Sequence, residues 1–237
     1  MIKQTAFRLR RNLLPVAGAV LIAAGAFNAA SAQTAPADAT ATPGSDQAAT
    51  ANPGPSITGF RNAQFGMTQE QVRGVIESEF HLPASAIKAG ENSIQHTAVL
   101  NVAVPDLVPG GGTANVAYVF GYQSHKLIEV NILWSKVVDP TITPQMIYQN
   151  GETLQQYFAG EGFPPQRTTG NVATPNGILL FRASDPTGNA VLLILSGTMT
   201  KDPKSPDKSA LEPNALTLAY AADPQHPDVF QLNKGSF

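Results

Sequence analysis

The 237-residue chain contains no cysteine. This absence excludes disulfide bonds, thiolate chemistry, cysteine-ligated metal sites and a lipid anchor attached through an N-terminal cysteine. Charge is also scarce, because Asp, Glu, Lys and Arg together make up 14% of the residues. A disordered chain would carry more charge and less than the 43% hydrophobic content found here, so we expect most of the chain to fold.

Basic clusters are missing beyond residue 32. The chain has 15 Lys plus Arg against 17 Asp plus Glu, and residues 1–32 hold four of the basic residues and none of the acidic ones. The rest therefore carries 11 basic (15 − 4) and 17 acidic residues, a formal net charge of −6. Nucleic-acid binding needs a clustered positive surface, so we expect no nucleic-acid partner.

Residues 1–32 have the pattern of an export signal. Four basic residues precede an uncharged apolar run at 13–27, and small residues at 30–32 form a signal-peptidase site. The run is rich in Ala and Gly, whereas a membrane span needs about 20 strongly apolar residues. We expect cleavage before Gln33, no membrane span in the mature chain, and a periplasmic or secreted location. General secretion and twin-arginine export both stay open, as does a retained anchor.

Residues 33–55 differ in composition from the remainder of the mature chain. They consist mainly of Ala, Thr, Pro, Gly, Gln and Asp and contain no large apolar residue. Such a segment buries too little surface to offset its ordering entropy, so we expect a disordered linker. The folded part should start near residue 56.

A first helix is predicted at 69–80. Thr68 and Gln71 fit a capping box, in which the two side chains bond each other's backbone N–H groups. Val72, Ile76 and Phe80 then follow at the spacing of one helical face. Pro83 prevents continuation.

Alternating apolar residues predict three strands after this helix. The strands are expected at 94–104, 116–122 and 127–134, separated by the glycines at 110–112 and a short polar turn at 123–126. Short connections of this kind join antiparallel neighbours. Residues 56–139 should therefore form a helix followed by an antiparallel meander.

The second half, 140–237, repeats this order of elements. Thr143 and Pro144 begin a helix. The sequence leaves open whether Asn150-Gly151 interrupts this helix. Strands are expected at 177–183, 190–198 and 216–221, with a loop near 200–213 and an irregular C-terminal tail. The fold class is α+β, either one domain or a helix-plus-meander unit repeated twice in tandem.

The segment Phe65-Gly66-Met67-Thr68, followed by Val72 on the first helix, resembles the start of several small exported bacterial modules. They include the SmpA/OmlA outer-membrane assembly lipoproteins and the repeats of β-lactamase inhibitor protein. The resemblance covers a short stretch and implies a helix packed on an antiparallel sheet that serves protein contacts. This chain lacks the anchoring cysteine of the lipoproteins, and the resemblance assigns no functional residue.

Catalytic and metal motifs are incomplete. Residues 205–208 fit the Ser-x-x-Lys pattern but lie in a proline-rich polar stretch without partner motifs. The four histidines are scattered, and Asp223, His226 and Asp228 form the nearest grouping of metal-ligand types, in a segment with two prolines. We therefore assign no catalytic residue, no metal ligand and no cofactor.

Aromatic residues offer the last route to a site. Tyr118, Phe120, Tyr122 and Trp134 lie on predicted strands and would line one sheet face. Such a face can bind a sugar, a peptide or an apolar ligand, or it can be core. Whether the face is covered decides between the two.

The sequence supports two functional classes. The first is an exported, non-catalytic cell-envelope protein that binds a protein partner or a small ligand, and we favour it because catalytic motifs are incomplete. The alternative is an exported hydrolase or enzyme inhibitor whose site is assembled from residues far apart in the sequence. The sequence defines neither the ligand nor the oligomeric state.

Overall fold

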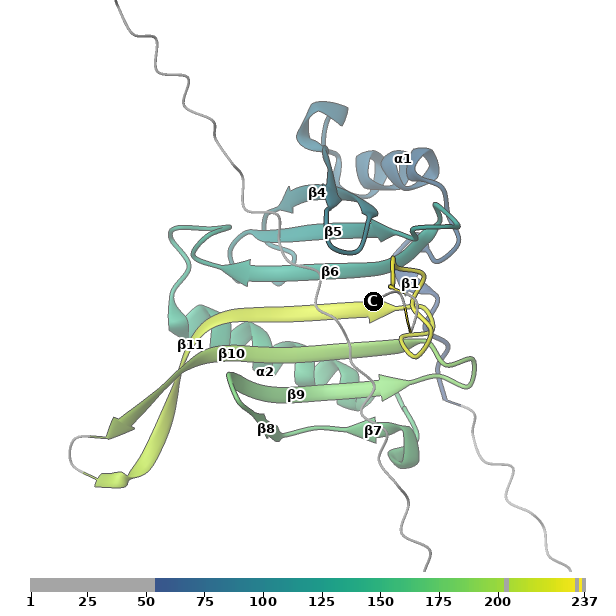
Figure 1. The fold of residues 1–237 in the computed structure, drawn as a ribbon. Helices are drawn as coiled ribbons and strands as arrows, with labels where there is room; N and C mark the ends of the chain where they lie inside the picture. The colour runs from purple at the N-terminus through teal and green to yellow at the C-terminus, as the bar shows by residue number, and fades with distance from the viewer. Residues whose placement is uncertain (1–53, 203–204, 233–234, 236–237) are drawn as a thin grey trace, which may run out of the picture.

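The computed structural model describes residues 54–202, 205–232 and 235. In these residues, two α-helices pack on one face of a nine-stranded antiparallel sheet (Figure 1). The predicted α+β class with antiparallel strands is confirmed at this level. The predicted signal at 1–32 and nearly all of the predicted linker at 33–55 lie outside the described residues.

The elements follow a simple order along the chain. The strands of the first half are β1 (Gly59–Phe60), β2 (Ala63–Gln64), β3 (Lys88–Asn92), β4 (Thr97–Val104), β5 (Ala114–Phe120) and β6 (Leu127–Ser135). Those of the second half are β7 (Thr168–Thr169), β8 (Val172–Thr174), β9 (Gly177–Ser184), β10 (Ala190–Asp202) and β11 (Ser205–Ala221). The helices are α1 (Gln69–Phe80) and α2 (Pro144–Gly160), with short 3-10 turns at Ala84–Ala86 and Pro165–Arg167.

Helix α1 has the predicted bounds and cap. The Thr68 hydroxyl accepts a hydrogen bond from the Gln71 backbone N–H, and the Gln71 side chain accepts one from the Thr68 N–H. Both orphan N–H groups at the start of the helix are thereby satisfied. Val72 and Ile76 are fully buried against the sheet, so the helical period was read correctly.

The first meander differs from its prediction in two strands. β5 spans Ala114–Phe120 where 116–122 was expected, and β4 starts late. β4 begins at Thr97, because the Asn92 side chain accepts hydrogen bonds from the N–H groups of Ile94 and Gln95 and forms a turn. His96 has a left-handed φ of 52°, and Ile94 is 81% exposed. The strand expected from residue 94 therefore starts three residues later. Residues 88–92 form β3, which was not predicted from the sequence.

The two halves form a single sheet in the order β3-β4-β5-β6-β11-β10-β9-β7, with β8 also paired to β9. The last strand of the first half, β6, pairs antiparallel with the last strand of the second half, β11. The expected boundary at 139–140 lies between β6 and α2. The sheet and its core continue across that boundary.

The prediction of a loop near 200–213 is wrong. β10 and β11 continue as a hairpin that projects beyond the rest of the sheet (Figure 1). Ser205 to Pro213 pair with β10 alone, so the other edge of this segment is free. A strand with a free edge tolerates proline, because no neighbouring strand needs the N–H group that proline lacks. From 222 to 232 the chain has neither helix nor strand, as expected for the irregular tail.

The core lies between the sheet and the helices. Leu100, Tyr118 and Val130 belong to one row of cross-strand neighbours facing α1 and α2. On the opposite face, Val99 and Val119 join a small separate cluster with Ala117 and Ile128. No helix in the described part of the chain is long and apolar enough to cross a membrane.

Candidate ligand-binding pocket

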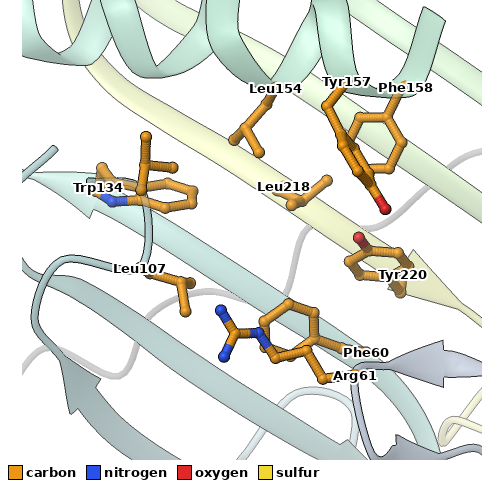
Figure 2. A pocket seen from close by; sticks show the side chains of 10 residues that line it. Phe60, Arg61, Leu107, Trp134, Leu154, Tyr157, Phe158, Leu218 and Tyr220 are labelled. Atoms are coloured by element: carbon orange, nitrogen blue, oxygen red, sulfur yellow. The ribbon is translucent and has the colours of Figure 1, made fainter. Parts of the chain in front are cut away.

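A pocket of about 350 Å³ lies between α2, the sheet and the β1–β2 hairpin. Figure 2 shows its walls, to which α2, β6, β11 and the β4–β5 connection contribute. Nine of its ten lining residues are apolar or aromatic: Phe60, Leu107, Val108, Trp134, Leu154, Tyr157, Phe158, Leu218 and Tyr220, with Arg61 as the tenth. Ligand pockets typically span about 300–1,000 Å³, so this one suits a small ligand.

Aromatic contacts fix the wall beneath α2. Phe158 stacks on Phe181 of β9, with ring centroids 5.4 Å apart and planes 18° apart. The centroid of the Tyr220 ring lies 6.3 Å from that of Phe158 and 5.6 Å from that of Phe60. Ring pairs in this range stabilise one another by about 0.5–1.5 kcal/mol beyond their burial. The wall is therefore formed before any ligand enters.

Two tyrosine hydroxyls face each other at one side of the pocket. Tyr157 comes from α2 and is 57% exposed, whereas Tyr220 comes from β11, and Figure 2 shows their oxygen atoms turned toward one another. Burial, followed by the nearby Tyr157 and Glu161, raises the pKa of Tyr220. Partial burial and then Glu161 raise the pKa of Tyr157. Both hydroxyls therefore stay protonated at neutral pH, and that of Tyr157 already bonds the Glu161 side chain.

Arg61 brings the only charged side chain to the pocket among its described lining residues. It lies in the two-residue turn between β1 and β2 and adopts a left-handed φ of 52°. Its guanidinium lies 5.6 Å from the centroid of the Phe60 ring and 5.5 Å from that of Phe80. Its Nη1 donates to Glu79 Oε1 at 3.3 Å, and Asn62 also donates to Glu79. Two rings and one carboxylate thus hold the side chain in place.

Trp134 forms the inner end of the pocket. The side chain is fully buried, and its Nε1–H has no hydrogen-bond partner among the described residues. A buried donor without an acceptor costs about 1–3 kcal/mol. It is also the single tryptophan of the chain, so its fluorescence reports on this pocket alone.

The four aromatic residues expected as a binding surface do not form one. Tyr118, Phe120 and Trp134 are at most 1% exposed, because α1 and α2 cover that face of the sheet. Tyr122 is 38% exposed and lies beyond the end of β5, where its ring contacts Phe230 at 5.6 Å. Of the four residues, only Trp134 lines the pocket.

Sequence reasoning missed Arg61 and Tyr220 as pocket residues. It did not identify Tyr157 as a pocket residue either. These three residues are brought together from a turn near the start of the fold, a helix and the last strand. No local pattern links such distant positions, and the apolar spacing of α2 looks the same whether the helix covers core or pocket.

The remaining chemical candidates do not converge. Residues 205–208 lie on the projecting hairpin. His226 Nδ1 lies 3.1 Å from Asp223 Oδ2 on the surface, whereas the Asp228 carboxylate accepts backbone hydrogen bonds from Gln123 and Ser124. No group of three or more His, Asp or Glu side chains within the described ranges is placed to hold a metal ion.

A second feature lies on the opposite face of the sheet. Glu129 lines a cavity of about 30 Å³ beneath the C-terminal tail, together with Pro224, Pro227 and Val229 of the tail. Burial raises the pKa of Glu129 to about 7, although a hydrogen bond from Asn131 acts in the other direction. The cavity is too small for a ligand, and the Glu129 side chain lies half-buried beneath the tail.

Comparison with protein-family models, with curated proteins and with solved structures gives no match for this chain.

Proposed function

We propose that this chain is an exported, non-catalytic binding protein that holds a small, largely apolar ligand in the pocket between α2 and the sheet. The observation that supports this most directly is the pocket itself. It is lined almost entirely by apolar and aromatic side chains, yet it opens beside an otherwise packed core. Leaving such surface uncovered forfeits about 25 cal/mol per Å² of hydrophobic stabilisation, which a bound ligand would restore.

Export is the second part of the proposal. It rests on the basic start, the apolar run and the small-residue cleavage pattern of residues 1–32. Under this proposal the mature protein acts in the periplasm or outside the cell. A tandem origin, in line with the resemblance to repeated exported modules, fits the order of elements, because each half supplies one helix and then a meander ending at the β6–β11 pair.

Binding of a neutral fluorophore tests the pocket. We would titrate the mature protein, residues 33–237, with N-phenyl-1-naphthylamine, which fluoresces in apolar surroundings. The variant Leu154→Trp places a large ring in the pocket, whereas Gln156→Trp adds the same ring at an exposed position of the same helix. We expect saturable binding to the wild type and to Gln156→Trp, and at least about tenfold weaker binding to Leu154→Trp.

Thermal unfolding of both variants shows whether the fold is intact. Equal binding by all three proteins would place the fluorophore elsewhere and contradict the proposal. Absence of binding to the wild type would favour the alternative of a protein partner.

A further inference from the structure

Arg61 has a backbone conformation that an arginine rarely adopts. A left-handed φ is disfavoured for residues with a Cβ, and the residues that tolerate it best are Gly, Asn and Asp. The β1–β2 turn nevertheless uses an arginine there, with φ 52°. Residues in sparsely populated conformations gather at ligand sites, where the surrounding structure holds them in place. The turn directs the Arg61 side chain toward the pocket (Figure 2).

The guanidinium of Arg61 has hydrogen-bonding capacity left over. Its Nη1 bonds Glu79, and Nη2 and Nε have no protein acceptor among the described residues. A guanidinium carries five N–H donors in a planar fork and can hold two carboxylates on different edges. In Figure 2 the guanidinium lies beside the Phe60 ring at the edge of the pocket, and the Arg61 side chain is 42% exposed.

The polar groups of the pocket are mainly donors. Arg61, the Tyr220 hydroxyl and the Trp134 indole N–H can donate, whereas the Tyr157 hydroxyl already bonds Glu161, and the rest of the lining is apolar. A ligand that satisfies this set carries acceptor oxygens at one end of an apolar body. Negative charge at that end complements the single lining cation.

Building on the proposed function, we infer that the ligand is an apolar monocarboxylate, a hydrocarbon or aryl body with one carboxylate head that binds the free edge of the Arg61 guanidinium. The body lies along Leu154 and Leu218 toward Trp134. Glu79 keeps the guanidinium oriented and competes with the ligand for its positive charge.

A matched pair of ligands tests this inference. Decanoate and 1-decanol share one chain length and differ only in the head group. We would measure their binding to the mature protein through the emission of Trp134 and through displacement of N-phenyl-1-naphthylamine. Decanoate should bind the wild type at least tenfold more tightly than 1-decanol, and Arg61→Gln should remove this preference.

Two further variants separate the role of Arg61 from general effects of charge or folding. Arg182→Gln removes one positive charge from a strand position facing away from the helices and should keep the preference for decanoate. Glu79→Gln removes the competing carboxylate and should strengthen decanoate binding severalfold without affecting 1-decanol.

The outcomes are distinguishable. If the fluorophore binds in the pocket but decanoate and 1-decanol bind equally, the head-group inference is wrong and the proposed function stands. The same conclusion follows if Arg61→Gln keeps the preference, or if Glu79→Gln weakens decanoate binding as Arg61→Gln does. If neither ligand nor the fluorophore binds the folded wild type, the proposed function fails and the inference fails with it.

Discussion

The carboxylate of Asp185, in the turn between β9 and β10, accepts a hydrogen bond from the backbone N–H of Ile57 at 2.9 Å, across 128 positions of sequence. The side chain of Asn189 in the same turn donates to the Ile57 carbonyl oxygen at 2.8 Å. Both polar groups of Ile57 are therefore satisfied by one turn. This contact anchors the segment that leads into β1 and Arg61, so it also positions one wall of the pocket.

Loss of the Asp185 carboxylate should destabilise the fold. Asp185 is 5% exposed and also accepts hydrogen bonds from Thr187 and Asn189, so Asp185→Ala leaves the buried Ile57 N–H and two partly buried N–H groups without an acceptor. We expect the free energy of unfolding to fall by about 2–3 kcal/mol, measured by urea denaturation. Glu77→Ala, at an exposed position of α1, is the control and should change it by less than about 0.5 kcal/mol.

The stabilisation by Asp185 should also depend on pH. Burial acts to raise the pKa of Asp185, but hydrogen bonds from Thr187, Ile57 and Asn189 outweigh it and hold the pKa below its usual value. A lowered pKa stabilises the folded state above the usual carboxyl pKa of about 4, and this stabilisation is lost as the pH falls through the folded-state value. The stability gap between wild type and Asp185→Asn should therefore narrow below pH 4. If the difference in free energy of unfolding between the two proteins stays constant from pH 7 to pH 2.5, the pKa of Asp185 is not lowered in the folded state.

Glu129 should change the pH dependence of stability in the direction opposite to Asp185. Burial raises its pKa from 4.5 to about 7, so the folded state disfavours the ionised form. The resulting penalty is absent below pH 4.5, grows between pH 4.5 and 7, and is constant above. Glu129→Gln should therefore stabilise the protein at pH 8 by up to about 3 kcal/mol and have little effect at pH 4. Thermal or urea unfolding at the two pH values measures this difference, and equal effects at both would contradict the raised pKa.

The Asn150-Gly151 pair shows which features of the fold can be read from sequence and which cannot. The sequence left open whether this pair interrupts α2, because both residues are poor helix formers. In the structure the helix continues, and Asn150 donates from Nδ2 to the Gly111 carbonyl oxygen at 2.9 Å. A Cβ on Gly151 would lie 2.9 Å from Leu180 Cδ1, so the glycine permits close approach of helix and sheet.

Local patterns thus predicted α1, the start of α2 and most of the strands, because capping and alternation depend on neighbours in sequence. The pairing of β6 with β11 and the meeting of Arg61 with Tyr220 depend on contacts between distant segments, on which a local pattern carries no information. The extended hairpin was missed because prolines and polar residues in 200–213 are typical of loops, and backbone pairing outweighed that preference.

Asn150→Ala should separate local from tertiary effects in α2. Alanine is the better helix former by several tenths of a kcal/mol, but the substitution leaves the buried Gly111 carbonyl oxygen without its Asn150 donor. We expect a net loss of about 1–2 kcal/mol in urea denaturation. Gln149→Ala, at an exposed position of the same helix, changes the helix propensity without removing a buried hydrogen bond. It should be neutral or slightly stabilising. A gain at both positions would mean that the Asn150 hydrogen bond contributes nothing.

The C-terminal tail, residues 222–232, should keep the pKa of Glu129 raised. Asp228 fastens it to the β5–β6 connection, accepting hydrogen bonds from the N–H groups of Gln123 and Ser124 at 2.9 Å each. Asp228→Ala should loosen the tail and admit water to the Glu129 carboxyl, whose pKa then falls toward its usual value. The gain from Glu129→Gln at pH 8 should therefore be smaller in the Asp228→Ala background than in the wild type. Double-mutant cycles at pH 8 and pH 4 measure this coupling. An unchanged gain would mean that the sheet alone, and not the tail, keeps water from Glu129.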